Sequence, residues 1–189
     1  MDKPTSQIMA RVMDQLNILN DLIKDLFDTR KIKEGMLVVN KKSIHIEPVV
    51  TEAITLSEYV NGNRKVVIEG KIDNKISADR DRIIQVLTNL LTNASKFSPD
   101  DTPITVTLKE KNGEAIISVQ DLGEGISESD QKHIFEAYYS PEKNGPKKGL
   151  GLGLYICSEI IKLHKGKIWV KSKLHKGSTF SFSLPLKST

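Results

Sequence analysis

The chain has little of what several large classes of protein require. Its 189 residues include one cysteine, Cys157, so an internal disulfide is excluded and a reducing compartment is favoured. No apolar run approaches the roughly 20 residues of a membrane-spanning helix. The first fifteen residues contain no apolar stretch typical of a secretory signal. We therefore expect a cytoplasmic chain, and we interpret Cys157 as a small buried helix residue rather than a functional thiol.

Aromatic residues are also scarce, at 5% of the chain, which leaves few side chains on which single-stranded nucleic acid could stack. The net charge is only +4, although lysines recur through 162–176. We interpret this basic segment as the solvated face of a sheet, and we expect no nucleic-acid partner. The alternative that stays open is an electrostatic preference for anions such as nucleotides, or for an acidic partner.

Residues 5–31 contain no glycine or proline, and their apolar residues recur in steps of three and four. This spacing predicts a helix with an a/d seam of nearly three heptads. A seam this regular favours contact with another helix, in a hairpin or a dimer, over packing against its own domain. The seam residues are Met9, Val12, Leu16, Leu19, Ile23 and Leu26.

After Gly35 the pattern changes to short alternating strands and further helices, without strict βαβ alternation. The predicted strands are 36–40, 43–49, 65–72, a hairpin over 104–121 with an Asn-Gly turn, 167–172 and 178–185. The predicted helices are 48–60 (opened by Pro48), 79–97, 127–133 and 151–164. This order predicts an α+β two-layer sandwich.

The helix predicted over 79–97 carries two amides where apolar residues would be expected. Its core face comprises Ile83, Leu87, Leu90, Leu91 and Ala94, and a separate polar stripe comprises Gln85, Asn89, Asn93 and Lys96. An amide carbonyl is a hard, uncharged ligand suited to Mg²⁺ or to a phosphate environment. From this stretch alone, a merely solvated polar stripe is an equal alternative.

The stretch "DLGEGI" (121–126) follows directly on a predicted strand, which places Asp121 at a strand exit. Gly123 and Gly125 allow a sharp turn and the close approach of a flat ligand. A carboxylate at this position can accept hydrogen bonds from an exocyclic amine. Taken alone the pattern is weak, since such turns are common.

A second glycine-rich stretch, "GLGLGL" (149–154), leads directly into a predicted helix. It offers backbone N–H groups and the positive end of a helix dipole to phosphates. It has neither the Gly-Lys-Ser/Thr of a P-loop nor the dinucleotide-binding spacing. A tight packing turn is the alternative interpretation.

In this order, "NLLTNASKF", "DLGEGI", "IFEAYY" and "GLGLGL" resemble the N, G1, F and G2 boxes of sensor histidine kinases, part of an ATPase superfamily with the gyrase B subunit and a heat-shock chaperone. The final segment, from "LHKGKIWV" to "FSFSLP", also resembles that family. The resemblance covers about 36–186, and it implies a Bergerat-type sandwich with a mixed sheet covered by helices on one face. The helix at 7–31 resembles the second helix of the family's dimerisation hairpin.

The resemblance implies ATP and Mg²⁺ as cofactors. It makes Asn93 the metal ligand, places Asn89 beside the phosphates and brings Lys96 into contact with them; these three are the implied catalytic residues. Phe97 would lie beside the nucleotide, at a position where tyrosine is common. Asp121 would bind the adenine amino group.

The implied ATP lid spans 136–148, anchored by Phe135 and by Tyr138 or Tyr139. Its F box departs from the family pattern, because Ala137 and Ser140 stand where proline and arginine are frequent. The full implied nucleotide-binding set is Asn89, Asn93, Lys96, Phe97, Asp121, Gly123, Gly125, Ile126, Tyr138, Lys147, Lys148, Gly149, Leu150, Gly151, Leu152, Gly153, Leu154 and Thr179.

Asn89 favours a kinase over a hydrolase. Hydrolases of this superfamily place a glutamate four residues before the metal-binding asparagine, and a neutral amide cannot take a proton from water. Neutral histidine, the acceptor in such kinases, needs no such base. None of the four histidines, His45, His133, His164 and His175, lies on the seam helix, and we interpret each as structural.

We therefore expect a catalytic portion of a longer kinase, with the acceptor histidine on another segment. The expected domains are a partial dimerisation helix at 1–34 and an ATP-binding domain at 35–189. The expected partners are that acceptor helix, a response regulator receiver domain and a second copy through 7–31, and the parent protein can be anchored in the inner membrane. An ATP hydrolase, a serine kinase of the same superfamily and a non-catalytic dimerisation module stay open as alternatives.

Overall fold

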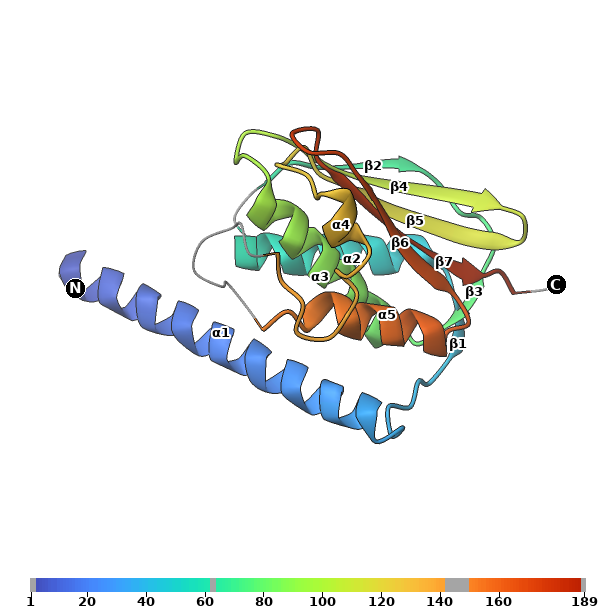
Figure 1. Cartoon of the computed structure of the whole chain (residues 1–189), viewed down its shortest axis with the longest axis horizontal. Helices are drawn as coiled ribbons and strands as arrows, with labels where there is room; N and C mark the ends of the chain where they lie inside the picture. The colour runs from blue at the N-terminus through green and yellow to red at the C-terminus, as the bar shows by residue number, and fades with distance from the viewer. Residues whose placement is uncertain (1–2, 62–63, 142–149, 188–189) are drawn as a thin grey trace.

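The computed structural model describes residues 3–61, 64–141 and 150–187 (Figure 1). A mixed five-stranded sheet has the order β2-β4-β5-β7-β6, with β2 parallel to β4 and the other neighbours antiparallel. Its strands are β2 (Val66–Gly70), β4 (Ile104–Lys111), β5 (Glu114–Gln120), β6 (Lys167–Ser172) and β7 (Ser178–Pro185). A separate antiparallel pair joins β1 (Lys42–Ile44) to β3 (Ile76–Ala78).

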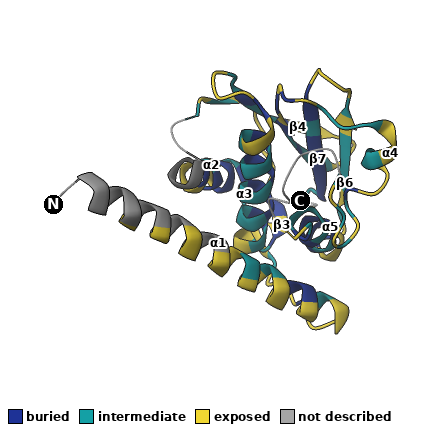
Figure 2. Ribbon diagram, turned by 60° about the vertical axis from the view of Figure 1, so that its left-hand side comes forward, coloured by how far each residue is buried: buried dark blue, intermediate teal, exposed yellow. Residues whose placement is uncertain are grey.

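The longer helices beside the sheet lie together on one of its faces (Figures 1 and 2). They are α2 (Ile46–Asn61), α3 (Arg80–Phe97) and α5 (Gly153–Leu163), and α4 (Glu128–Gln131) is a single short turn. This arrangement confirms the α+β sandwich. The predicted hairpin is confirmed as well, because Asn112 and Gly113 both have positive φ (53° and 77°), as a two-residue type I′ turn requires.

The core lies between the helices and the inner face of the sheet. All five predicted core residues of α3, from Ile83 to Ala94, are buried. They face strand residues such as Val106, Ile117 and Phe182, which are fully buried. Each buried leucine or isoleucine contributes about 1.5–3 kcal/mol to folding, so α3 is firmly fixed to the sheet and its remaining face is held in a defined orientation.

Three local predictions between 36 and 49 are wrong in detail. Residues 36–40 form neither a helix nor a strand, and the next strand ends at Ile44. Helix α2 begins at Ile46, so Pro48 lies inside its first turn rather than opening it. Proline is tolerated there because first-turn N–H groups have no intrahelical partner. Strand β3, three residues long, was not predicted.

Helix α1 (Lys3–Lys33) is longer than predicted and projects away from the rest of the chain (Figure 1). All six seam residues are exposed, with fractions between 42 and 55%, so the seam is not packed against its own domain. Among the α1 side chains that the structure describes, the buried ones lie in the C-terminal part, at Asp28 and Thr29, so this part is docked. No helix among the described residues is long and apolar enough to span a bilayer.

Candidate functional site

Helix α3 begins at a well-formed cap that ties it to two other segments. The Asp79 carboxylate accepts a hydrogen bond from the Arg82 N–H at 3.3 Å and another from the Asn40 N–H at 2.7 Å. The Asp79 N–H donates to Nε2 of His164 at 2.9 Å, and Nδ1 of His164 lies 2.8 Å from the Ile160 carbonyl oxygen. Burial lowers the pKa of His164. His164 is therefore a buried, neutral, hydrogen-bonded residue.

The polar stripe of α3 divides into two parts with different partners. Near the start of the helix, Gln85 Nε2 and Arg82 Nη1 both donate to Oδ2 of Asp28 on α1, each at 2.8 Å. Gln85 therefore helps to dock α1 rather than facing a ligand. The part of the stripe left for a ligand begins one turn later, at Asn89.

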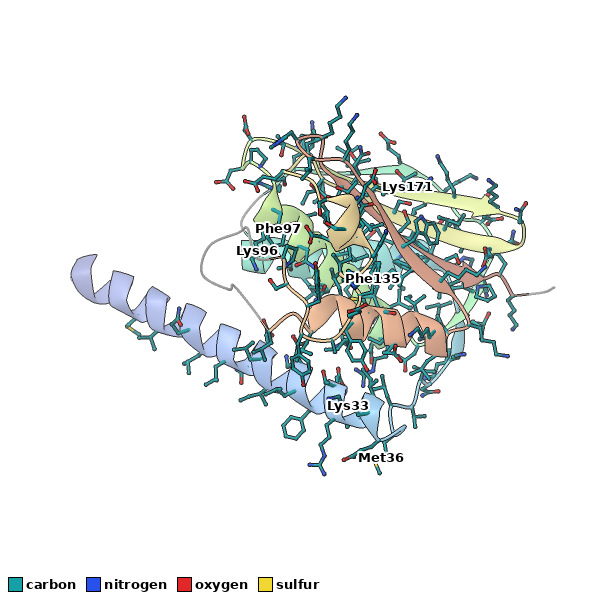
Figure 3. The ribbon with its side chains drawn as sticks, viewed as in Figure 1. Lys33, Met36, Lys96, Phe97, Phe135 and Lys171 are labelled. Carbon is teal, nitrogen blue, oxygen red and sulfur yellow. The ribbon has the colours of Figure 1, made fainter. Side chains whose placement is uncertain are left out.

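Asn89 and Asn93 are half-buried and bonded to each other. Nδ2 of Asn93 donates to Oδ1 of Asn89 at 3.0 Å. This bond orients the Asn93 amide and leaves its carbonyl oxygen available as an acceptor. One turn further on, Lys96 and Phe97 are exposed, with the Lys96 ammonium 5.0 Å from the Phe97 ring centroid. Figure 3 shows both side chains near the C-terminal end of α3.

Asp121 lies at the exit of β5, as predicted, and is 4% exposed. Its Oδ1 accepts hydrogen bonds from the Gly123 N–H at 2.8 Å and from the Ser178 N–H at 3.3 Å. Burial raises the pKa of Asp121, and these two backbone hydrogen bonds oppose the shift. The carboxylate is thus fixed through one oxygen, and Oδ2 can accept from a ligand.

Two of the predicted glycines pack directly on α3. A Cβ at Gly153 would overlap the side-chain amide of Asn89, and a Cβ at Gly123 would overlap the carbonyl oxygen of Phe97. Both loops therefore lie against the helix that carries the amide pair. The three separate stretches of sequence meet at one place because glycine permits this close approach.

The second glycine loop also contacts the first residues of the predicted lid. Gly151 has a positive φ of 67°, its carbonyl oxygen accepts from the Tyr138 N–H at 3.0 Å, and a Cβ there would crowd the backbone of Tyr138 and Tyr139. Helix α5 then starts at Gly153 without a side-chain cap at Leu152. The N–H groups of its first turn are therefore open to an anion.

The lid anchors hold the chain just before residues 142–149. Phe135 packs edge-on against Phe180, with ring centroids 6.4 Å apart. The Tyr139 hydroxyl donates to Oδ1 of Asp130 at 2.7 Å, so Tyr139 is tied to the domain. Tyr138 has a positive φ of 66° and points outward, with its ring 5.4 Å from the ammonium of Lys33 on α1. Lys147, Lys148 and Gly149 lie outside the described residues.

The other predicted nucleotide-binding residues differ in how far they are buried. Leu152 is buried in the core, whereas Leu150 is exposed and Leu154 half-buried. The Ile126 N–H donates to Ser172 Oγ at 2.8 Å, and Thr179 is half-buried on β7. Gly125 has a φ of 73° and packs on the Lys173 carbonyl group.

Sequence reasoning missed Gly177 and Ser178, which complete the surroundings of Asp121. A Cβ at Gly177 would overlap the Asp121 carbonyl oxygen, and the Ser178 N–H reaches the Asp121 carboxylate. The only signal in the sequence was the Gly-Ser pair before the last strand. The pairing of Gln120 with Thr179 in the sheet brings these residues to Asp121, and that register is a long-range property.

Residues 78–188 match the family model described as "Histidine kinase-, DNA gyrase B-, and HSP90-like ATPase". The chain is 33% identical over 184 residues to the adaptive-response sensory kinase SasA of Gloeothece citriformis, covering 95% of this chain and 47% of that protein. It is 34% identical over 190 residues to the sensor protein KdpD of Clostridium acetobutylicum, covering 97% of this chain and 21% of that protein. The chain thus spans half or less of the length of these relatives.

Solved structures of histidine kinases are similar to this chain as well. The catalytic domain of histidine kinase ThkA aligns with a TM-score of 0.66 at 31% identity, covering 78% of this chain and 96% of that one. Full-length ShkA in complex with AMPPNP aligns with a TM-score of 0.80 over the whole of this chain and 40% of that one. At 23% identity, the second likeness concerns the fold alone.

Proposed function

Because the chain belongs to the histidine kinase-, DNA gyrase B- and HSP90-like ATPase family and contains a histidine kinase catalytic domain, we propose that it binds Mg·ATP and donates the γ-phosphoryl group to a histidine on a dimerisation helix. One observation carries this proposal: Gly123 and Gly153 bring the buried Asp121 loop and the α5 loop onto the helix that bears Asn89 and Asn93. An adenine acceptor, an amide pair and open N–H groups are then adjacent.

In this proposal Asp121 accepts a hydrogen bond from the adenine amino group. Its Oδ1 already receives two backbone hydrogen bonds, which fix the carboxylate plane and direct Oδ2 away from them. Gly123, Gly125 and Ile126 shape the adenine side, and Phe97 and Thr179 border it. The loop from Gly149 to Leu154 and the first turn of α5 receive the triphosphate, with Lys147, Lys148 and Tyr138 contributed by the lid region.

The residues present suit Mg²⁺ bound mainly through the nucleotide. The described residues contain no group of three acidic, histidine or cysteine side chains that would form an all-protein metal site. One neutral amide oxygen, that of Asn93, is left open by the Asn89–Asn93 hydrogen bond. Mg²⁺ commonly takes one or two protein ligands together with phosphates and waters, so Asn93 would hold it. When bound, the ion neutralises charge on the β- and γ-phosphates.

Within this site, Asn89 orients Asn93, and Lys96 contacts phosphate oxygens from the next turn. Phosphoryl transfer depends chiefly on positioning and charge stabilisation, so these three residues are the proposed catalytic set. Asn89 also argues against water as the acceptor, because an amide cannot act as a general base. A histidine acceptor fits better, since neutral imidazole is itself a nucleophile near pH 7.

We place the acceptor histidine outside this chain's own four. Both ring nitrogens of His164 are engaged within the core, and His133 is bonded to Glu136 on the surface. Residues 1–34 would contribute a dimerisation helix, with 35–189 as the ATP-binding domain. The proposed partners are an acceptor helix, a response regulator receiver domain and a second copy through the exposed seam.

Calorimetry with Mg·ATP tests the site directly. The wild-type chain should bind, and Asn93→Ala should lose the Mg²⁺-dependent part of the affinity while keeping the binding of metal-free nucleotide. Normal Mg·ATP binding by Asn93→Ala would refute the metal assignment.

Labelled ATP, with and without a separately supplied dimerisation hairpin, tests the acceptor. Label should enter the hairpin. Label entering this chain alone would contradict the placement of the acceptor, and steady phosphate release that is lost in Asn89→Ala would point to a hydrolase.

A further inference from the structure

A buried arginine at the far end of α3 has no role in the site described so far. Arg64 lies between α2 and β2, and its side chain is only 6% exposed. Its Nη1 donates to the Ser95 carbonyl oxygen at 3.1 Å and to Ser98 Oγ at 2.5 Å. Its Nη2 donates to the carbonyl oxygens of Ser98 and Pro99, at 3.1 and 2.6 Å. One guanidinium thus forms hydrogen bonds with both the end of α3 and the turn that follows.

These contacts are mainly to backbone oxygens, which identifies what the arginine does. The last carbonyl groups of a helix have no intrahelical donor and carry its negative partial charge. Arg64 supplies a donor to one of them, Ser95, and Ser98 Oγ donates to another, Ala94, at 2.5 Å. The Asp100 carboxylate lies 3.2 Å from Nη2 and is fully exposed, so this ion pair contributes little.

The helix end that Arg64 holds is also the end that would meet phosphate. Asn93 and Lys96, the proposed metal and phosphate contacts, both lie in the last two turns of α3. Without compensation, the negative end of the helix dipole would oppose a polyanion at this place. A buried guanidinium both offsets that charge and fixes the turn from which Lys96 extends.

The proposed adenine acceptor, the Asp121 carboxylate, is held by other elements. The Asp121 carboxylate receives its hydrogen bonds from Gly123 and Ser178, which belong to the loop after β5 and to β7. Within the described residues, the hydrogen bonds of Arg64 go to the end of α3 and the turn after it, and none reaches either of these segments. The loop also touches α3, because Gly123 packs on the Phe97 carbonyl oxygen, but the Asp121 carboxylate is not bonded to the turn that Arg64 holds. A perturbation at Arg64 should therefore affect the phosphate side more than the adenine side.

We propose that Arg64 is a positioning residue for phosphate binding: it neutralises and orders the C-terminal turn of α3, so that Lys96 is held where a nucleotide's phosphates bind. This inference rests on the proposed binding of Mg·ATP. It concerns a residue that lies outside all four sequence boxes.

The test compares Arg64→Met with the matched variant Arg80→Met in the full chain. Arg80 is an exposed arginine at the opposite end of the same helix, paired with Glu52. Calorimetry would measure the affinity for Mg·ATP, and competition against Mg·ATP would measure the affinity for adenosine. Arg64→Met should weaken Mg·ATP binding about tenfold and leave adenosine affinity within about twofold, because the Asp121 carboxylate is held by Gly123 and Ser178 and not by Arg64. Arg80→Met should change neither.

A double-mutant cycle asks whether Arg64 acts through Lys96. If it does, the variant carrying both Arg64→Met and Lys96→Met should lose less Mg·ATP affinity than the product of the single losses. Arg64→Lys provides a second variant should Arg64→Met fold poorly. It keeps the charge but not the planar fork, so it should still weaken Mg·ATP more than adenosine.

The outcomes separate this inference from the proposed function. A wild-type chain that binds no Mg·ATP would refute the proposed function itself. Wild-type binding with equal losses of ATP and adenosine in both Arg64 variants would overturn the positioning role and leave Arg64 as a fold-stabilising residue. Unchanged Mg·ATP binding in a folded Arg64 variant would overturn it as well.

Discussion

The contact between Gly153 and Asn89 gives the sharpest prediction, because it separates folding from binding. In Gly153→Ala the new Cβ would overlap Nδ2 of Asn89 and lie 3.1 Å from Cγ and Oδ1 of the same amide. Only a side chain has to move, so the backbone can stay in place. The Asn89 amide would be displaced, and its hydrogen bond to Asn93 would break.

The effect on stability should be small. Losing the Asn89–Asn93 hydrogen bond costs about 0.5–1.5 kcal/mol. Replacing glycine by alanine in a helix gains about 0.5–1 kcal/mol. Chemical denaturation should therefore show a free energy of unfolding within about 1 kcal/mol of the wild type. Mg·ATP affinity, by contrast, should fall about tenfold or more, because Asn93 loses the bond that orients it.

The background variant Asn89→Ala is the control. With the amide removed, adding Gly153→Ala should cause no further loss of Mg·ATP affinity. A further loss in that background would mean that the methyl group obstructs the nucleotide directly. That result, or wild-type affinity in Gly153→Ala, would refute the argument.

Three further substitutions test other parts of the molecule. Asp121→Asn should weaken ATP and adenosine by similar factors in calorimetry, because it replaces an adenine acceptor and touches no phosphate contact; a loss confined to ATP would contradict the adenine assignment. Asp28→Ala should raise hydrogen exchange in the last two turns of α1 and lower the free energy of unfolding by about 1–3 kcal/mol, because the half-buried Arg82 side chain loses its charged partner; unchanged exchange would show that the pair does not dock α1. Burial and two neighbouring aspartates raise the pKa of Asp25 to about 6, so the native state binds the extra proton and stability falls as pH rises from about 4 through 6. The whole pKa shift corresponds to at most about 3 kcal/mol of folding free energy, and to less because the group is half exposed. In urea denaturation, Asp25→Asn should be more stable than the wild type at pH 7 but not at pH 4. An equal difference in stability at both pH values would contradict the raised pKa.

The features that the sequence predicted are those with local causes. The apolar arc of α3, the Asn-Gly hairpin and the order of strands after residue 100 follow from periodicity and turn chemistry, and the structure confirms them. That the amide-bearing helix and the two glycine loops lie close together was predicted from the family resemblance and not from the spacing of residues.

The features that were missed depend on distant partners. Strand β3 is three residues long and is paired with the equally short β1, so it has no pattern long enough to detect, and the strand predicted at 43–49 was placed too far along the chain for the same reason. Gln85 has the same place on the helix wheel as Asn89, yet its partner is Asp28, more than fifty positions earlier. Arg64 is an ordinary surface residue in the sequence and becomes buried only because the end of α3 lies over it.

Helix α1 is fixed near its C-terminal end, whereas its six seam side chains are exposed, so the helix can act as a lever. Its fulcrum is Asp28, held by Arg82 and Gln85 on the same helix that carries Asn89. At 1.5 Å of rise per residue, Met9 lies about 29 Å from that fulcrum, so a tilt of roughly 10° moves it by about 5 Å. A small rotation of α3 against α1 would thus displace the far end of the seam by about one helical turn. Conversely, a force applied at that end would exert a torque on α3.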